Sequence, residues 1–330
     1  MTRFCICGGG SLGLVTAGVL AQQNGVEVNL LTSKPALWSK DIKVTDLNGK
    51  LYQGHLHIIS NQAEEVISQS DIILLCVPGF LIEKTLRDIA PYITTQAVGS
   101  IVSSTGFFFR AHEIFDNKTA LFGFQRVPYI ARVTEYGHTA QLLGYKTQLY
   151  MAIENLPDLF AAQWRTWLNT PVSALHNYLE AALTNSNPLL HTARLFGMWY
   201  DWTEGKTYSQ PIKFYAEWDE YSVEQYIAMD TEFQALCKIV GVSIPSVLTY
   251  YESSDATSLA HKLRSIQAFQ SIDAPMKKTE QGWIPDFQSR YFTEDFPFGL
   301  QLVKDLAVKN HLETPHIDKI LSWGKQIMKD

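Results

Sequence analysis

A glycine-rich segment near the N-terminus constrains the fold of this 330-residue chain more than any other feature. Gly8 to Gly13 (GGGSLG) follows the apolar run Phe4 to Cys7 and overlaps Leu12 to Gln23, where apolar residues recur on one helical face. Gly25 ends that helix, and Val26 to Leu31 (VEVNLL) is a second run typical of a strand. The order strand, turn, helix, strand predicts a βαβ unit, which opens a doubly wound parallel sheet.

Each glycine of this segment has a physical role in dinucleotide binding. Gly8 permits the tight turn, Gly10 lets the backbone approach a pyrophosphate, and Gly13 lets the helix pack against the strand. Ser11 and Leu12 lie in the first helical turn, where free N–H groups and the positive end of the helix dipole face the phosphates. A glycine-rich turn alone also occurs in proteins that bind nothing, so the flanking elements carry the prediction of a dinucleotide site.

The end of the second strand indicates the choice of cofactor. NAD sites usually place Asp or Glu there to bind the ribose 2′-hydroxyl, whereas this chain has Thr32, Ser33 and Lys34. Two hydroxyls and a cation favour a 2′-phosphate, so NADP is the predicted cofactor and NAD the alternative. The competing interpretation is that Lys34 is only a solvated loop residue.

Ile72 to Val77 (IILLCV) is a continuous apolar run that predicts a parallel strand covered on both faces. Cys76, Val77 and Pro78 end this run and are expected beside the nicotinamide, because open α/β sheets bind ligands at the carboxyl ends of their strands. Cys76 is expected to be a buried thiol and not a nucleophile. Further strands are predicted at 98–103, 119–124 and 148–153, and helices at 61–70 and 81–90. Asn48-Gly49 between two β-rich runs predicts a hairpin, 42–47 and 51–59, inserted into the sheet topology.

From about Leu156 helical patterns dominate the chain. Helices are predicted at 159–168, 172–183, 223–240, 258–269, 300–308 and 317–328. A chain of this length suits two domains. We predict an NAD(P)-binding Rossmann-type domain over 1–172, with a doubly wound parallel sheet, and an all-α substrate domain over 173–330.

Composition excludes several classes of partner. The net charge of −6 without a basic run argues against nucleic acid, and no segment has the roughly 18 uninterrupted apolar residues of a membrane helix. The four cysteines show no CxxC spacing, so free thiols are expected and no metal site. Arg3 and the apolar run to Ala21 resemble a secretory signal, but its cleavage would remove the glycine segment, so a cytoplasmic protein is favoured.

A dehydrogenase that reduces a carbonyl or imine needs an acid, and histidine suits this role because imidazole titrates near neutral pH. The sequence contains nine histidines that could serve as this acid. His176 and His191 lie near the predicted domain junction, and composition does not separate them. From the residues alone, His191 is better explained as a capping or packing histidine.

One segment around His191 resembles a known family. Thr184 to His191 (TNSNPLLH) is similar to the TNxNPxxH segment of the octopine and nopaline dehydrogenases, the opine dehydrogenases. Other matches follow in family order: Val127 to Arg132 resembles an LPYxxR loop, Phe214-Tyr215 with Asp230 and Glu232 a helical-domain signature, Ala274-Pro275 a turn, and Arg290 to Asp295, before Pro297 and Gly299-Leu300, an RYxxED segment. The resemblance spans Gly8 to Leu300. It implies a Rossmann domain followed by an all-α domain, with the active site between them.

The resemblance also implies roles for single residues. His191 would be the general acid, Asp295 the carboxylate that orients it, and Arg290 a bidentate clamp for a substrate carboxylate. The alternative for Asp295 is a loop residue paired with Arg290. Asn187 would either bind substrate or stop a helix before Pro188, and the sequence favours neither interpretation over the other.

Two departures from the family pattern bear on specificity. Thr192 stands where proline is common, and Arg126 stands where a small hydroxyl residue is expected. Arg126 would add a cation to the keto-acid pocket or lie on the surface.

The predicted function is an NADP-dependent opine dehydrogenase that condenses an amino acid with a 2-oxo acid such as pyruvate through an imine. A homodimer is the assembly considered. Two alternatives stay open: a 2-oxo acid reductase of the ketopantoate-reductase type, which usually depends on a catalytic lysine that has no matching motif here, and a nucleotide-binding sensor without turnover.

Overall fold

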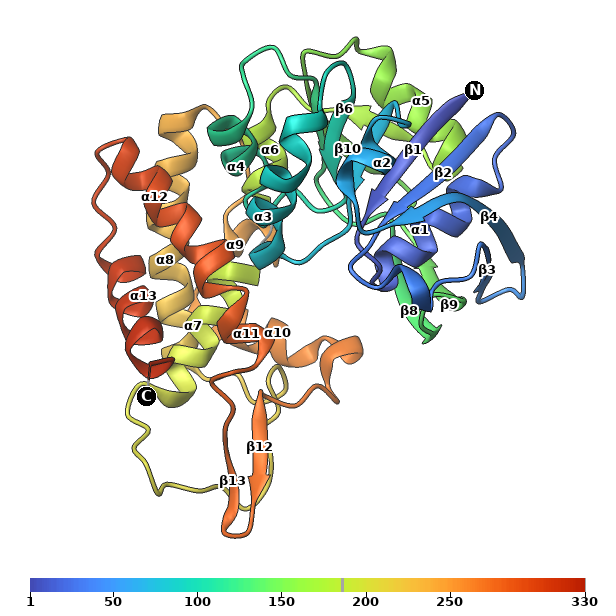
Figure 1. Cartoon of the computed structure of the whole chain (residues 1–330). Coiled ribbons are helices and arrows are strands. Elements are labelled where there is room, and N and C mark those ends of the chain that lie inside the picture. Colours follow the sequence, from blue (N-terminus) through green and yellow to red (C-terminus); the bar gives the residue numbers. More distant parts are fainter. Residues whose placement is uncertain (185–186, 330) are drawn as a thin grey trace. The chain divides into compact units, whose positions relative to one another are not determined.

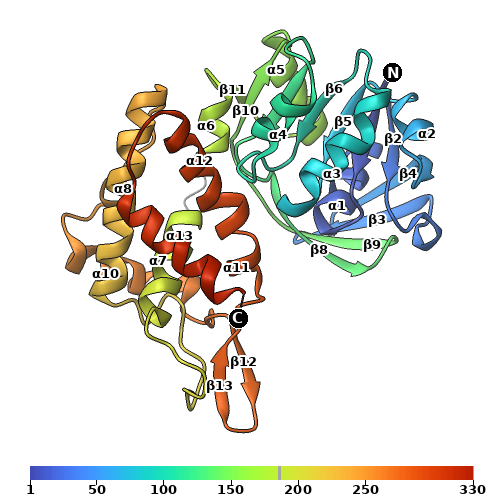
Figure 2. The same cartoon turned by 60° about the vertical axis from the view of Figure 1, so that its left-hand side comes forward.

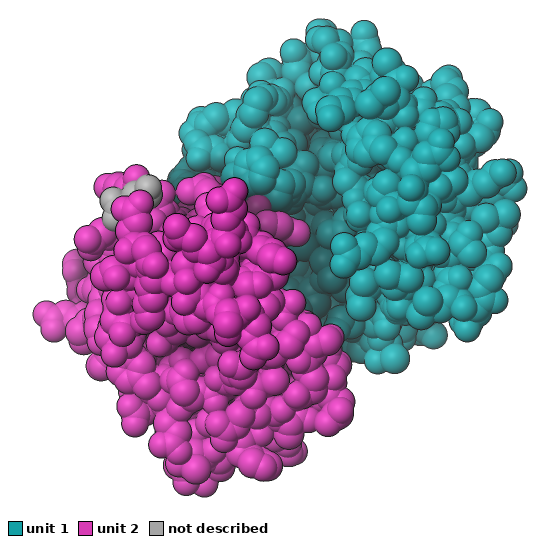
Figure 3. Space-filling view, turned by 90° about the horizontal axis from the view of Figure 1, so that it is seen from below, with its two compact units in different colours: residues 1–185 teal, residues 186–330 magenta. Residues whose placement is uncertain are grey.

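The computed structural model describes residues 1–184 and 187–329. The chain forms two compact units, Met1–Asn185 and Ser186–Asp330, which Figure 3 distinguishes by colour. This division lies 13 residues after the predicted boundary between 172 and 173, because the strand Val172–Ala174 and the helix Tyr178–Ala182 belong to the first unit. Each unit is described by itself below.

The first unit is built on one large sheet with helices on both faces (Figure 1). Its strands are β1 (Thr2–Cys7), β2 (Val26–Leu31), β3 (Asp41–Asp46), β4 (Leu51–Ser60), β5 (Ile72–Leu75), β6 (Ala97–Ser100), β7 (Leu121–Phe124), β8 (Tyr129–Glu135), β9 (Thr139–Tyr145), β10 (Leu149–Glu154) and β11 (Val172–Ala174). Its helices are α1 (Ser11–Ala21), α2 (Ala63–Ile67), α3 (Gly79–Ile89), α4 (Phe107–Ile114), α5 (Leu159–Leu168) and α6 (Tyr178–Ala182), with short 3₁₀ turns η1 (Pro35–Leu37) and η2 (Ala90–Tyr92).

The strand order places a Rossmann sheet at the centre of this unit. The order is β11-β10-β7-β6-β5-β1-β2-β4-β3-β9-β8, and the six strands from β7 to β4 pair in parallel. The chain therefore reverses its winding direction between β1 and β5, where doubly wound sheets bind nucleotides. The predicted βαβ opening and doubly wound sheet are confirmed.

Alternation along the central strands supplies a core on each side of the sheet. Phe4 and Ile6 of β1 pack with α1 and α5, whereas Cys5 and Cys7 face the layer formed by α2, α3, α4 and α6 (Figure 2). Successive strand side chains point to opposite faces, so covering both faces requires an apolar residue at nearly every position. The continuous apolar run of β5 has the same cause.

Three predictions for this unit were wrong. The 42–47/51–59 hairpin is no insertion, because β4 pairs in parallel with β2 and supplies the third strand of the Rossmann order. The 127–132 segment is no loop, because its last four residues open β8. The predicted helix at 172–183 is the edge strand β11 followed by the short helix α6.

The second unit is helical apart from one hairpin. Its elements are α7 (Asn187–Trp199), α8 (Glu220–Val240), α9 (Val247–Tyr250), α10 (Ala256–Ser265), η3 (Gln267–Phe269), the hairpin strands β12 (Met276–Thr279) and β13 (Gly282–Pro285), α11 (Arg290–Thr293), the π-helical turn η4 (Phe296–Leu300), α12 (Gln301–Lys309) and α13 (Pro315–Ile327). Asp219 caps α8 and Asp255 forms a capping box for α10. The predicted helical character is confirmed, with the β12–β13 hairpin as the exception.

Two acids of the predicted helical-domain signature link these helices. Asp230 accepts the Val247 N–H at 2.9 Å, at the start of α9. Glu232 accepts the His316 and Ile317 N–H groups, in the first turn of α13. Both carboxylates thus satisfy helix N-termini and fix the packing of α8 against its neighbours. No helix in the described part of the chain is both long and apolar enough to span a membrane.

Candidate active site

The glycine segment between β1 and α1 has the backbone that a dinucleotide requires. Gly8 adopts φ +116°, and a Cβ there would lie 2.7 Å from the Cys76 carbonyl oxygen. A Cβ on Gly13 would lie 1.9 Å from the Gly8 carbonyl oxygen, so the helix could not approach the turn with any side chain at this position. Gly8 and Gly13 therefore have the structural roles predicted from the sequence.

Gly10 differs from the other two glycines because nothing lies within 4 Å of its ideal Cβ position. It precedes α1 with φ −81° and ψ −172°, a backbone that any residue adopts, and it provides no side-chain cap. The N–H groups of the first turn have no intrahelical acceptors. Ser11 turns its Oγ toward β8, where it accepts the Val133 N–H at 3.1 Å. Open space in front of unpaired N–H groups at a helix N-terminus fits a pyrophosphate.

A pocket of about 720 Å³ opens at the carboxyl ends of β1, β2 and β5. Most predicted cofactor residues line it: Gly8, Gly10, Thr32, Ser33, Lys34, Cys76, Val77 and Pro78. Ser11, Leu12 and Gly13 form the first turn of α1 and are not among the residues that line this pocket. The sequence did not point to Asn61, Lys84, Asp88 and Tyr136, which also line the pocket. Their positions depend on the sheet order, which no local pattern encodes.

The charges around this pocket are mainly positive. Lys34 is exposed, with its Nζ 6.0 Å from the centre of the Tyr136 ring. Thr32 is buried, and its Oγ1 accepts the Lys34 N–H at 3.5 Å. Among the lining residues the one carboxylate, Asp88, is paired with Lys84 at 2.5 Å. The end of β2 therefore offers a hydroxyl and an ammonium group to a ligand anion.

Cys76 lies at the end of β5, as predicted, and is almost fully buried. Burial raises the pKa of this thiol far above its usual value, and the nearby Cys7 raises it further. The prediction of a buried thiol is confirmed. A neutral thiol is a poor nucleophile, which leaves Cys76 as a packing residue of the pocket wall.

His191 is the buried polar centre of the second unit. It lies on α7 with 9% of its surface exposed, and its Nδ1 is 2.8 Å from Asp295 Oδ2. Its Nε2 is 3.2 Å from the hydroxyl of Tyr215, which belongs to the segment between α7 and α8. The Tyr291 ring packs against the imidazole at 4.7 Å between centres. His176 is exposed, so burial separates the two histidines that composition left equal.

Arg194, one turn after His191, fixes the segment that carries Tyr215. Its Nε donates to the Phe214 carbonyl oxygen at 3.0 Å and its Nη2 to the Glu217 carbonyl oxygen at 2.7 Å. Its Nη1 pairs with Asp219 at 2.6 Å. Burial lowers the pKa of Arg194, and Asp219 opposes that shift. No sequence pattern singled out this arginine, because its partners come from tertiary structure.

Replacing Arg194 with methionine should lower the free energy of unfolding by about 3 kcal/mol, because two carbonyl groups lose their donor and Asp219 loses its cation. Urea unfolding followed by tryptophan fluorescence measures this change. The matched control is Arg87→Met, which removes an exposed pair with Glu83 and should cost less than about 1 kcal/mol. Equal stabilities of the two variants would contradict this role for Arg194.

The remaining predicted site residues lie apart from this cluster or at its edge. Arg290 begins α11 and is exposed, and Asp295 pairs with His191, not with Arg290. Asn187 is the first residue of α7, with Pro188 next to it in the first turn. Asn187 thus begins a helix and does not stop one. In the first unit, Arg126 donates to the Thr184 carbonyl oxygen at 2.8 Å.

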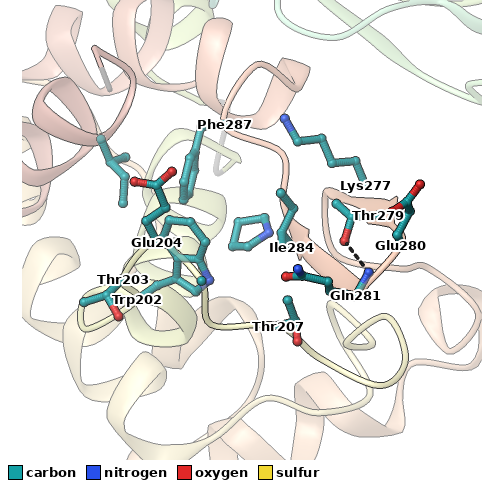
Figure 4. Close-up of a pocket in the computed structure, with 13 residues that line it drawn as sticks. Trp202, Thr203, Glu204, Thr207, Lys277, Thr279, Glu280, Gln281, Ile284 and Phe287 are labelled. Atoms are coloured by element: carbon teal, nitrogen blue, oxygen red, sulfur yellow. Dashed lines mark hydrogen bonds between the residues drawn. The ribbon is translucent and has the colours of Figure 1, made fainter.

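The helical unit contains a separate hollow of about 1120 Å³, which lies between the 202–207 loop and the β12–β13 hairpin. Figure 4 shows Trp202 and Phe287 on one side and Thr279, Glu280 and Gln281 on the other. None of the predicted site residues lines it, and its walls are largely exposed surface.

Comparisons with known proteins agree with both units. The family model of the NAD/NADP octopine/nopaline dehydrogenase α-helical domain matches residues 174–328, and that of ketopantoate reductase PanE/ApbA matches residues 4–107. Opine dehydrogenase of Haliotis discus hannai is 29% identical over 98% of this chain and 90% of its own length. A structure of octopine dehydrogenase with NADH and L-arginine has a TM-score of 0.89 at 24% identity, covering 100% of this chain and 90% of that one. Another, with NADH and pyruvate, has a TM-score of 0.87 at 24% identity, covering 99% and 89%.

The Rossmann sheet, its phosphate loop and the helical unit define a nicotinamide-dependent dehydrogenase. Its second unit carries the α-helical domain of the NAD/NADP octopine/nopaline dehydrogenases, and the chain is an NAD(P)-dependent oxidoreductase that acts on CH–NH groups.

Proposed function

We propose that this protein is an NADP-dependent opine dehydrogenase that joins the amino group of an amino acid to a 2-oxo acid such as pyruvate. The observation that carries the proposal is the buried pair of His191 Nδ1 and Asp295 Oδ2 at 2.8 Å. Such a pair suits an acid that has to hold and release a proton. The opine dehydrogenase from Haliotis and the pyruvate-containing octopine dehydrogenase structure support the choice of substrates.

In this proposal His191 acts as general acid. The Asp295 carboxylate fixes the tautomer through Nδ1 and stabilises the imidazolium, so Nε2 is the nitrogen that gives a proton to the carbonyl oxygen, which leaves as water when the imine forms, or to the imine nitrogen when hydride adds to its carbon. Arg290, exposed at the start of α11, is the proposed clamp for a substrate carboxylate. The bound nicotinamide supplies a hydride to the imine carbon.

The preference for NADP is the finer part of the proposal. The pocket residues at the end of β2 fit a 2′-phosphate, because Lys34 offers a cation and Thr32 and Ser33 offer hydroxyls where an acid would select NAD. Asn187, the first residue of α7, and Arg126, which also donates to the Thr184 carbonyl oxygen, are proposed to contact substrate. A homodimer stays the proposed assembly.

Replacing Lys34 with alanine should raise the Michaelis constant for NADPH about tenfold and leave that for NADH nearly unchanged, because one exposed charge-assisted contact to a phosphate is lost. Initial rates at varied cofactor concentration measure both constants. Lys40→Ala is the control, since Lys40 bonds the His57 carbonyl oxygen and does not line the pocket. A wild-type protein that prefers NADH would contradict the choice of NADP.

A second candidate is a 2-oxo acid reductase, which the ketopantoate reductase match over residues 4–107 favours for the nucleotide-binding part. The helical unit matches the other family, and its buried acid pair contains histidine and not lysine. Oxidation of the reduced cofactor with pyruvate and a panel of amino acids separates the candidates. Dependence on both substrates supports an opine dehydrogenase, turnover with the oxo acid alone supports a reductase, and no turnover supports a nucleotide sensor.

A further inference from the structure

Tyr136 lines the pocket at the carboxyl ends of β1, β2 and β5 from the turn between β8 and β9. Its hydroxyl lies 2.8 Å from the position that a Cβ on Gly9 would occupy, and the Thr32 Oγ1 lies 2.9 Å from the same point. Two hydroxyls from segments far apart in the sequence therefore flank the same side of the glycine segment. Within the described residues the Tyr136 hydroxyl has no hydrogen-bond partner, so it is available to a ligand.

The turn that carries Tyr136 is fixed against the segment that follows β2. Gly137 has φ +75°, and a Cβ there would collide with the Leu37 carbonyl oxygen, so the two backbones lie in direct contact. The Ser39 N–H donates to the Gly137 carbonyl oxygen at 3.1 Å. The Tyr136 ring packs edge-on against buried Trp38 at 5.9 Å between centres. Backbone and ring contacts therefore place the hydroxyl, and removing it leaves the ring in position.

The Lys34 ammonium lies at the same wall of the pocket. Its Nζ is 6.0 Å from the centre of the Tyr136 ring, at the outer limit of a cation–π contact. A phosphate bound by Lys34 has further acceptor oxygens, which need donors of their own. The hydroxyls of Thr32 and Tyr136 are the donors that the two neighbouring segments bring to the glycine turn. A ribose 2′-hydroxyl is a single small group, whereas a phosphate offers three oxygens to such a set.

We propose that Tyr136 is a further cofactor-binding residue, whose hydroxyl donates a hydrogen bond to the 2′-phosphate of NADP. This inference rests on the cofactor choice in the proposed function. It adds a donor from the β8–β9 turn to the cation and hydroxyls at the end of β2. The preference for NADP is then a property of two segments that meet only in the folded sheet. Crowding at Gly9 supports this arrangement, because any side chain there would displace the Tyr136 and Thr32 hydroxyls.

The test is Tyr136→Phe, which removes the hydroxyl and keeps the ring that packs on Trp38. The Michaelis constant for NADPH should rise about fivefold, the usual effect of losing one partly exposed hydrogen bond to an anion, and that for NADH should stay unchanged. A general loss of structure would change both constants together, so their ratio separates binding from stability. Tyr150→Phe is the matched control, because Tyr150 on β10 is similarly exposed and does not line the pocket. Its ratio should equal that of the wild type.

A second measurement needs no turnover. Adenosine 2′,5′-bisphosphate and adenosine 5′-monophosphate differ only in the 2′-phosphate, and tryptophan fluorescence follows their binding. Tyr136→Phe should weaken binding of the bisphosphate about fivefold and leave the monophosphate unaffected. Equal losses for both ligands, or no loss for either, in a protein whose wild type prefers the bisphosphate would overturn the inference alone. A wild type that binds both ligands equally would instead contradict the choice of NADP in the proposed function, and the inference would fall with it.

Discussion

Replacing His191 with alanine should lower the turnover number for reductive condensation by about two to four orders of magnitude, the usual contribution of a positioned general acid. The imidazole is the buried group held by Asp295, and no other histidine in the described helical unit has that environment. Oxidation of NADPH at saturating concentrations of both substrates measures the turnover number. Cofactor affinity, measured by fluorescence titration, should change little, because the phosphate loop belongs to the other unit.

The control for this experiment is His176→Ala. His176 is exposed in the first unit and should be replaceable with little change in rate. If the His191 variant retained near-wild-type turnover, the general-acid role would have to be abandoned. If both variants lost activity together with their fluorescence-detected folding, the loss would report on stability and the His191→Gln variant would replace the alanine.

Replacing Gly10 with valine should raise the Michaelis constant for the cofactor about 100-fold while the protein keeps its thermal stability. The ideal Cβ of Gly10 meets no atom within 4 Å, and its backbone suits any residue, so the protein tolerates the side chain. The same open space is where a pyrophosphate would approach the N–H groups of α1. Losing two charge-assisted contacts there accounts for the expected size of the effect.

Gly144→Val is the matched control, because a Cβ at Gly144 meets only the Ile130 Cδ1 atom at 3.9 Å and β9 accepts a β-branched residue. It should alter neither the melting temperature nor the cofactor constant. Gly13→Ala should behave differently from both, with lost stability as well as lost binding, because its Cβ would lie 1.9 Å from the Gly8 carbonyl oxygen. A Gly10→Val protein with wild-type cofactor affinity would show that the nucleotide does not use this loop.

Local patterns were sufficient for the nucleotide-binding core. The β1–α1–β2 unit is continuous in sequence, and its glycines have roles that steric rules dictate. The order of the strands could not be predicted from local patterns. The parallel pairing of β4 with β2 depends on the packing of the complete sheet. The strands β8 and β9 were missed, and in β8 only Tyr129 is buried, so no continuous buried apolar run marks that strand.

The helical unit was predicted less completely, for a physical reason. Helix α7 was not recognised because buried His191 and Arg194 interrupt its apolar pattern, and polar residues at core positions are compatible only with partners that the local sequence does not reveal. His191 and Asp295 were found through the family resemblance and not from spacing. Tyr215 stood within a resembling motif, but its bond to Nε2 depends on a segment held by tertiary contacts.

Two buried side chains within one turn of helix α7 have different roles. His191 faces Asp295 and Tyr215, and Arg194 ties down the segment that carries Tyr215. Efforts to retune such a catalyst for new amines would therefore do better to leave this turn untouched and to vary exposed loops, because any change that loosens the arginine also displaces the hydroxyl in contact with the imidazole.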